Sequence, residues 1–220
     1  MRMLIFLLTA LGTLVTASAD EYWITYEGND FPENEGWTRH TYAGGAERWL
    51  EDGALVIDSI SVGDLQATDT YQQVDVRRPE PGELFVAEWR MRLDQFEESY
   101  DALVVIARPE PLGDLTFAHA LDHLVVFDDW DPIPVTPGEW HIYRFESEDM
   151  DAYTLLVDGA PAYEGHFQTP SLLDPLLAFG NAARGAASVS RWDYVRFGII
   201  PEPSSVLLLT VGFLARRGRG

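Results

Sequence analysis

A ten-residue stretch near the middle of the chain alternates apolar and charged side chains with a period of two. The apolar positions are Phe85, Ala87, Trp89, Met91 and Leu93, and the charged positions between them are Glu88, Arg90 and Arg92. Successive side chains of a β-strand point to opposite faces, whereas a helix would scatter this pattern around its axis. Residues 84–93 are therefore predicted to form a strand with one buried face.

The rest of the chain between residues 20 and 200 shows almost no helical period. Apolar runs at 102–107 and 124–127 are typical of buried strands, and further strands are predicted at 140–145 and 190–198, where Trp192, Tyr194 and Arg196 would share a face. Glycine-containing turns predict two hairpins, 49–57 and 153–163. A helical turn is expected only around 171–177. This pattern predicts an all-β fold, an antiparallel β-sandwich or jelly roll over residues 20–200.

Charge limits the partners of this domain. The chain has 36 acidic residues and 15 cationic ones, and residues 20–200 carry 35 acids against 11 arginines, a net charge of −24. Such a surface repels phosphate backbones and anionic lipids, so nucleic-acid binding is excluded. There is no cysteine, which excludes disulfides, thiolate catalysis and cysteine-containing zinc sites.

The first residues predict a secretion signal. Arg2 precedes an apolar run over 4–15, and the small residues Ala17 and Ala19 follow it. A basic start, a short apolar run and a small-x-small site are the three parts of a cleavable signal peptide. We expect residues 1–19 to be removed after Ala19; a buried strand or helix is the alternative.

The last twenty residues combine three features in order. Pro201, Glu202 and Pro203 precede an apolar segment over 206–215, and the basic residues Arg216, Arg217 and Arg219 follow it. Residues 201–220 resemble the PEP-CTERM sorting signal. The resemblance implies a short transmembrane helix that anchors the chain transiently in the inner membrane, with its basic end in the cytoplasm. It also implies cleavage by an exosortase and release to the cell surface or extracellular matrix of a Gram-negative-type bacterium.

The second half of the domain carries a second resemblance. Residues 138–143 form an aromatic strand, residues 153–159 end in Asp158 and Gly159, and residues 192–198 form an aromatic final strand. With Phe179-Gly180 between them, these segments resemble concanavalin A-like, laminin-G-like jelly rolls. That resemblance implies binding of glycans or matrix ligands, often with calcium, and some relatives of the fold hydrolyse glycans.

No catalytic residue is predicted. Glycan hydrolysis with retention needs two carboxylates about 5 Å apart. On a single strand this requires acids alternating on one face, and no predicted strand has them. The acidic run 146–151 is interpreted as a solvated loop between two strands, and a Gly-x-Ser-x-Gly motif is absent. The sequence therefore favours a protein that is not an enzyme.

Two weaker patterns concern metal ions and ligands. Asp128, Asp129 and Asp131 follow an apolar strand and could bind calcium, although an acidic turn without a metal is favoured. Trp130 between them is the candidate ligand contact. His119 and His123 could form a zinc pair, with hydrogen-bonded histidines favoured instead.

Seven tryptophans raise the question of sugar stacking. Three of them lie in strand patterns and are assigned to the core (Trp89, Trp140 and Trp192), whereas Trp37 and Trp49 are left open. The preferred hypothesis is an exported, non-enzymatic module that binds polysaccharide or a partner and is associated with exopolysaccharide. A glycan-cleaving hydrolase and a purely structural matrix protein are the alternatives.

Overall fold

The computed structural model describes residues 23–63, 67–97, 102–109, 113–127, 131–167, 173–182 and 186–201. Two antiparallel β-sheets make up almost all of it, so the predicted β-sandwich is confirmed. Within these ranges no α-helix occurs, and one 3-10 helix, η2, spans Pro32–Glu35. The helical segments expected in the signal and in the sorting tail lie outside the described residues.

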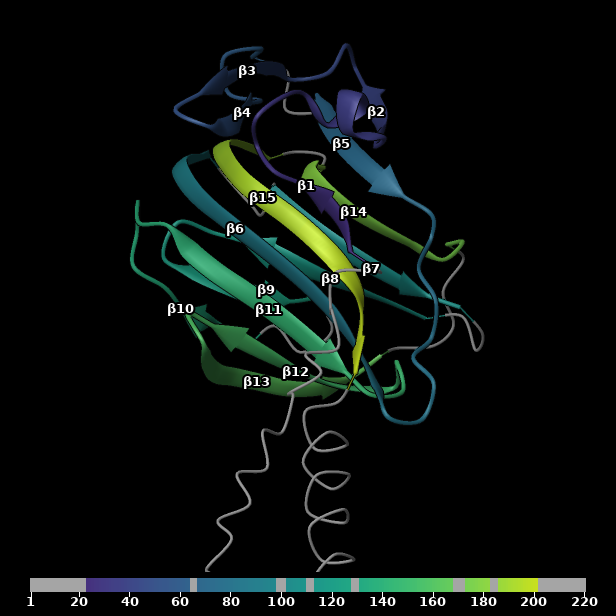
Figure 1. Cartoon of the computed structure of the whole chain (residues 1–220). Helices are drawn as coiled ribbons and strands as arrows, with labels where there is room; N and C mark the ends of the chain where they lie inside the picture. The colour runs from purple at the N-terminus through teal and green to yellow at the C-terminus, as the bar shows by residue number, and fades with distance from the viewer. Residues whose placement is uncertain are drawn as a thin grey trace, which may run out of the picture.

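The first sheet, called sheet A here, has eight strands and faces the reader in Figure 1. Its order is β13 (Ala160–His166), β12 (Ala152–Val157), β11 (His141–Ser147), β6 (Glu83–Glu97), β15 (Ala187–Pro201), β4 (Ala54–Asp58) and β3 (Glu47–Glu51), and β1 (Ile24–Tyr26) also pairs with β15. The two 15-residue strands, β6 and β15, run side by side through its middle.

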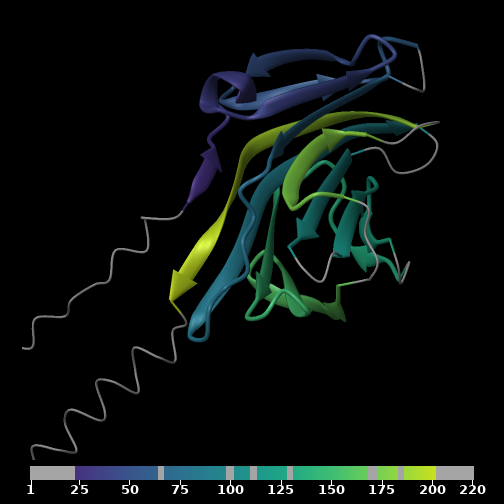
Figure 2. The same cartoon turned by 90° about the vertical axis from the view of Figure 1, so that its right-hand side faces the viewer.

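The second sheet, sheet B, has seven strands and packs behind sheet A, as the side view in Figure 2 shows. Its order is β10 (Ile133–Pro134), β9 (His123–Val126), β8 (Gly113–His119), β7 (Ala102–Arg108), β14 (Leu176–Asn181), β5 (Thr68–Gln73) and β2 (Thr38–Tyr42). Where the sequence pattern favoured a helical turn at 171–177, the described part instead leads into β14 at Leu176.

The core lies between the sheets and is rich in aromatic side chains. Phe85, Trp89 and the other apolar positions of β6 point inward, as the alternation predicted. Trp89 stacks on Tyr143 of the same sheet, with ring centroids 5.6 Å apart, and contacts Phe117 of the opposite sheet at 5.4 Å. Burial of these large rings supplies much of the driving force for pairing the sheets.

A β-bulge in β15 changes which side chains face outward. The register with β6 shifts between Trp192 and Tyr194, so that Asp193 is an extra residue. As a result Trp192 is fully buried, whereas Tyr194 and Arg196 are partly exposed. The expectation that Trp192, Tyr194 and Arg196 share one face is therefore wrong.

Candidate functional site

Charged side chains cover the outer face of sheet A, and Glu88 lies at their centre. Its strand neighbours in register are Arg144 of β11 and Arg196 of β15. Arg144 Nη1 donates to Glu88 Oε2 at 3.1 Å, and Tyr194 Oη and Arg196 Nη2 donate to Oε1 at 2.9 and 2.5 Å. Burial opposes ionisation of Glu88, but these three donors outweigh it and hold its pKa below the usual range.

An open cleft of about 600 Å³ lies on the same face of the sheet, over the end of β11, β12 and β13. Its lining includes four acidic side chains and one histidine: Glu146, Glu148, Asp149, Glu164 and His166. From the sequence, the acidic run 146–151 was assigned to a solvated loop, and Glu164 was given no assignment. The structure instead puts Glu146 within β11 and Glu164 within β13.

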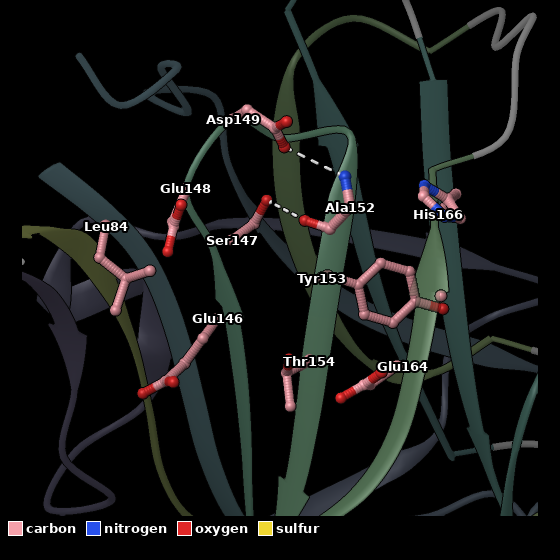
Figure 3. A pocket seen from close by; sticks show the side chains of 11 residues that line it. Leu84, Glu146, Ser147, Glu148, Asp149, Ala152, Tyr153, Thr154, Glu164 and His166 are labelled. Carbon is pink, nitrogen blue, oxygen red and sulfur yellow. Dashed lines mark hydrogen bonds between the residues drawn. The ribbon is translucent and has the colours of Figure 1, made fainter. Parts of the chain in front are cut away.

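Three side chains form one row across the floor of the cleft. Glu146 pairs in register with Thr154, and Thr154 pairs with Glu164. Figure 3 shows the three on neighbouring strands, with Glu164 directed toward Thr154 and Glu146 directed toward the side of Leu84. Strands in a sheet lie about 4.8 Å apart, so the backbones that carry the two carboxylates are about 9.5 Å apart.

Arg144 connects the cleft to Glu88 and its hydrogen-bond donors. Its Nε donates to Glu146 Oε1 at 2.6 Å, while its Nη1 contacts Glu88. Arg144 and Glu146 are two residues apart on β11 and therefore share the outer face. The direction of the Glu146 carboxylate is thus fixed by its neighbour, whereas the Glu164 carboxylate has no hydrogen bond or ion pair to another described residue.

The loop between β11 and β12 closes one side of the cleft and is held by its own polar groups. Asp149 Oδ1 accepts hydrogen bonds from the amides of Asp151 and Ala152 at 2.8 and 3.1 Å. Met150 adopts a left-handed conformation (φ 57°) and is fully buried. Arg78 donates to the Asp149 carbonyl through Nε and Nη2, at 3.1 and 2.7 Å. These contacts give the acidic wall of the cleft a defined shape.

Most residues of the predicted metal site lie outside the described part of the chain. This holds for Asp128, Asp129 and Trp130, and Asp131 is described as exposed. Within the described residues no three His, Asp or Glu side chains are grouped so as to hold a metal ion. The calcium site remains a prediction.

His119 and His123 are each hydrogen-bonded, as the favoured interpretation of the sequence predicted, and they do not form a zinc pair. His119 ends β8 and is buried, and Trp89 Nε1 donates to its Nε2 at 3.3 Å. His123 begins β9, across a turn, and its Nδ1 lies 2.6 Å from Asp122 Oδ1. Burial lowers the pKa of His119 to about 3, so this histidine is neutral and structural.

The tryptophan assignments are partly confirmed. Trp89 and Trp192 are fully buried, and Trp37, which was left open, is 2% exposed. Trp140 was assigned to the core but lies on the outer face of sheet A, where Arg90 and Arg92 pack on its ring at 4.8 and 5.4 Å. The assignment was wrong because Trp140 precedes His141, whose own side chain points inward.

The sorting-tail pattern is described only at its first residue. Pro201 ends β15 in an extended conformation opposite Glu83. Glu202, Pro203 and the basic cluster lie outside the described residues, as do Ala17 and Ala19 of the signal. Among the residues that the structure describes, no helix is long and apolar enough to cross a membrane.

Comparison with known proteins identifies relatives by structure alone. No family model matches the chain, which leaves the PEP-CTERM resemblance without support, and no curated protein matches it. A carbohydrate esterase from the Shiga toxin-encoding bacteriophage phi24B superposes with a TM-score of 0.62 at 10% identity, covering 80% of this chain and 97% of the esterase.

Two further solved structures have the same fold. The Crh5 transglycosylase in complex with NAG matches with a TM-score of 0.53 at 13% identity and covers 80% of this chain and 83% of its own. A protein of unknown function from Shewanella oneidensis MR-1 matches with a TM-score of 0.51 at 13% identity. The match covers 85% of this chain and 90% of the Shewanella protein. The fold is therefore the concanavalin A-like jelly roll that also occurs in carbohydrate-active proteins.

These neighbours contradict the expectation that the chain is not an enzyme. That expectation depended on the absence of alternating acids on one strand, yet the structural neighbours are mostly carbohydrate-active enzymes. The search of the sequence missed Glu146 and Glu164 because they lie on different strands. For Glu146 a signal was present, since it continues the alternation with the buried Tyr143 and Phe145 of β11.

Proposed function

We propose that this protein is a glycan-cleaving enzyme that acts at the acidic cleft of sheet A. The observation that carries the proposal is the row Glu146–Thr154–Glu164, which presents two carboxylates on one open face. The glycan-directed proteins on the same fold support the ligand class. The cleft is open and polar, as the binding of a hydroxyl-rich chain requires.

The spacing of the strands that carry the two carboxylates favours hydrolysis with inversion over retention. Inverting glycosidases keep their two carboxyl groups about 6.5–9.5 Å apart to leave room for a water molecule. The backbones that carry Glu146 and Glu164 are about 9.5 Å apart across two strand spacings, and the Glu146 carboxylate is directed away from Thr154 and Glu164, so the pair is too wide for retention (Figure 3). A retaining mechanism would require a pair closer to 5 Å.

The environments of the two residues suggest their roles. Glu146, whose direction Arg144 fixes, would take a proton from water as the water oxygen bonds to the anomeric carbon. The glycosidic carbon–oxygen bond breaks, and Glu164 would give its proton to the leaving oxygen. Proton exchange with solvent then restores both groups. Thr154, between them, would hydrogen-bond a sugar hydroxyl.

The test is the release of reducing ends from a panel of soluble polysaccharides by the purified protein. Glu146→Gln and Glu164→Gln should each lower kcat at least a hundredfold. Glu47→Gln, at an exposed position of the edge strand β3, is the matched control and should leave the rate unchanged. Proton NMR of the first product should show the inverted anomer. Cleavage at the wild-type rate by the double variant would refute the assignment.

We propose, from the sequence pattern alone, that this activity operates outside the cell. The signal over residues 1–19 and the tail over 201–220 support export, and exosortase cleavage near Pro201 stays part of this proposal. Sequencing both termini of the mature protein from its host would test it. A mature chain that still begins at Met1 and ends at Gly220 would contradict export and sorting.

A further inference from the structure

Two tryptophans at opposite sides of sheet A lie in one cross-strand row. Trp49 of β3 pairs with Val56 of β4, and Val56 pairs with Arg191 of β15. Arg191 pairs with Arg92 of β6. On the far side, His141 pairs with Met91, which places Trp140 next to Arg92. The strands that carry the row, from β3 to β11, follow one another in sheet A (Figure 1).

Both tryptophans reach solvent on this outer face. Trp49 is 36% exposed on the edge strand, and Trp140, immediately before β11, is partly exposed. The guanidinium groups of Arg90 and Arg92 pack on the Trp140 ring and hold it in place. Four strand spacings separate the two ends of the row, a span of about 19 Å. An indole that reaches solvent at each end of the row suits stacking against the apolar faces of sugar rings.

The polar groups between the rings carry no net charge. Arg92 Nε and Arg191 Nε both donate to Asp94, at 2.6 and 2.5 Å, and Arg191 Nη1 donates to Glu51. Arg90 forms an ion pair with Asp193. Three guanidinium groups therefore face three carboxylates. The row offers hydrogen-bond donors and acceptors to hydroxyl groups but has no unpaired cation for a uronate or sulfate.

This row is distinct from the cleft. Arg92 lies six residues along β6 from Val86, which pairs with Glu146. At about 3.3 Å per residue the separation is about 20 Å. A ligand bound to the row would not occupy the Glu146–Thr154–Glu164 site, although both lie on the same face.

We propose that the row from Trp49 to Trp140 is a second binding site, which holds an uncharged polysaccharide chain. The choice of a polysaccharide as the ligand rests on the proposed function. The strongly negative charge of the protein, −21, adds to the selection against polyanions. A chain held here would keep the enzyme on its polymer while the cleft acts on an accessible segment.

The test measures binding by affinity electrophoresis and calorimetry with the Glu146→Gln/Glu164→Gln protein, so that no ligand is degraded. Probes are soluble β-1,3-glucan, mixed-linkage β-glucan and galactomannan, with alginate as the polyanion. Trp49→Ala and Trp140→Ala should each raise the Kd for the neutral polymer that binds best by about tenfold. Tyr42→Ala, an exposed aromatic on sheet B, is the control and should bind as before.

The outcomes separate this inference from the proposed function. An unchanged Kd in the Trp49→Ala/Trp140→Ala double variant, the absence of binding to any neutral probe, or preference for alginate would overturn the second site. Cleavage of short oligosaccharides by the tryptophan variants, in the background with both glutamates intact, should stay at the wild-type rate. Loss of polymer binding by the tryptophan variants, together with persistent cleavage by the glutamine variants, would instead refute only the catalytic assignment.

Discussion

Arg108 of sheet B forms an ion pair with Asp151, in the loop between β11 and β12 of sheet A, with 2.9 Å between Nη1 and Oδ1. The Arg108 side chain is 2% exposed and packs on the ring of Phe167 at 5.2 Å. The same Nη1 donates to the carbonyl of Met150. The buried guanidinium of Arg108 in sheet B therefore holds the loop that forms one wall of the cleft.

Replacing Arg108 by methionine should loosen that loop. We expect the free energy of unfolding to fall by about 2 kcal/mol, because two hydrogen bonds to a charged group are lost while the exposed Asp151 stays solvated. If the cleft is catalytic, kcat should fall as well. Urea unfolding and the cleavage assay measure the two effects. Arg77→Met, an exposed residue paired with Glu83, is the control and should cost less than about 0.5 kcal/mol.

Glu88→Gln should destabilise the centre of sheet A. The neutral amide would leave Arg144 and Arg196 without their shared carboxylate, at a cost of about 2 kcal/mol. Because the folded-state pKa of Glu88 is depressed, its contribution is present above the unfolded pKa of about 4.3 and is lost as pH falls through the folded pKa. The variant should therefore lose less stability than wild type below pH 4.3. Equal acid sensitivity of both proteins would contradict this account.

His119 should make the fold sensitive to mild acid. Its folded-state pKa of about 3 lies far below the unfolded value of about 6.5, so between these pH values the unfolded chain binds one more proton. As pH decreases through that window, this residue alone should lower the free energy of unfolding by about 1.4 kcal/mol per pH unit. His119→Gln keeps an acceptor for Trp89 Nε1 and should flatten the profile between pH 6 and 4. Denaturant titrations at several pH values would show it.

Gly180→Ala should be among the most damaging small substitutions. Gly180 has φ 133°, and a Cβ there would lie 2.2 Å from the carbonyl oxygen of Asp69 on the neighbouring strand. Relief requires movement of backbone in β14 and β5, which we expect to cost at least about 3 kcal/mol. At Gly159 (φ 80°) nothing lies within 4 Å of the added Cβ, so Gly159→Ala isolates the conformational cost, about 1 kcal/mol. Similar losses in thermal unfolding for both variants would contradict the steric argument.

Local patterns predicted the long strand β6 and both hairpins, because side-chain alternation and Asp-Gly turns are properties of adjacent residues. The strand β5 was not predicted, since its polar side chains give no apolar period. The candidate site could not be read from the sequence for a different reason. Glu88 meets Arg144 and Arg196 across separations of 56 and 108 residues, and the register that joins Glu146 to Glu164 depends on pairing through β12.

The position of β15 has a consequence for how the chain folds. This strand, the last described, lies between β6 and β4 and pairs with both, so sheet A has no continuous centre until residues 187–201 are present. Residues up to 201 must therefore be synthesised before the sandwich closes, and contacts of such long sequence separation slow folding. A chain truncated before β15 would therefore leave the facing edges of β6 and β4 unpaired, with backbone groups open to pairing with another chain.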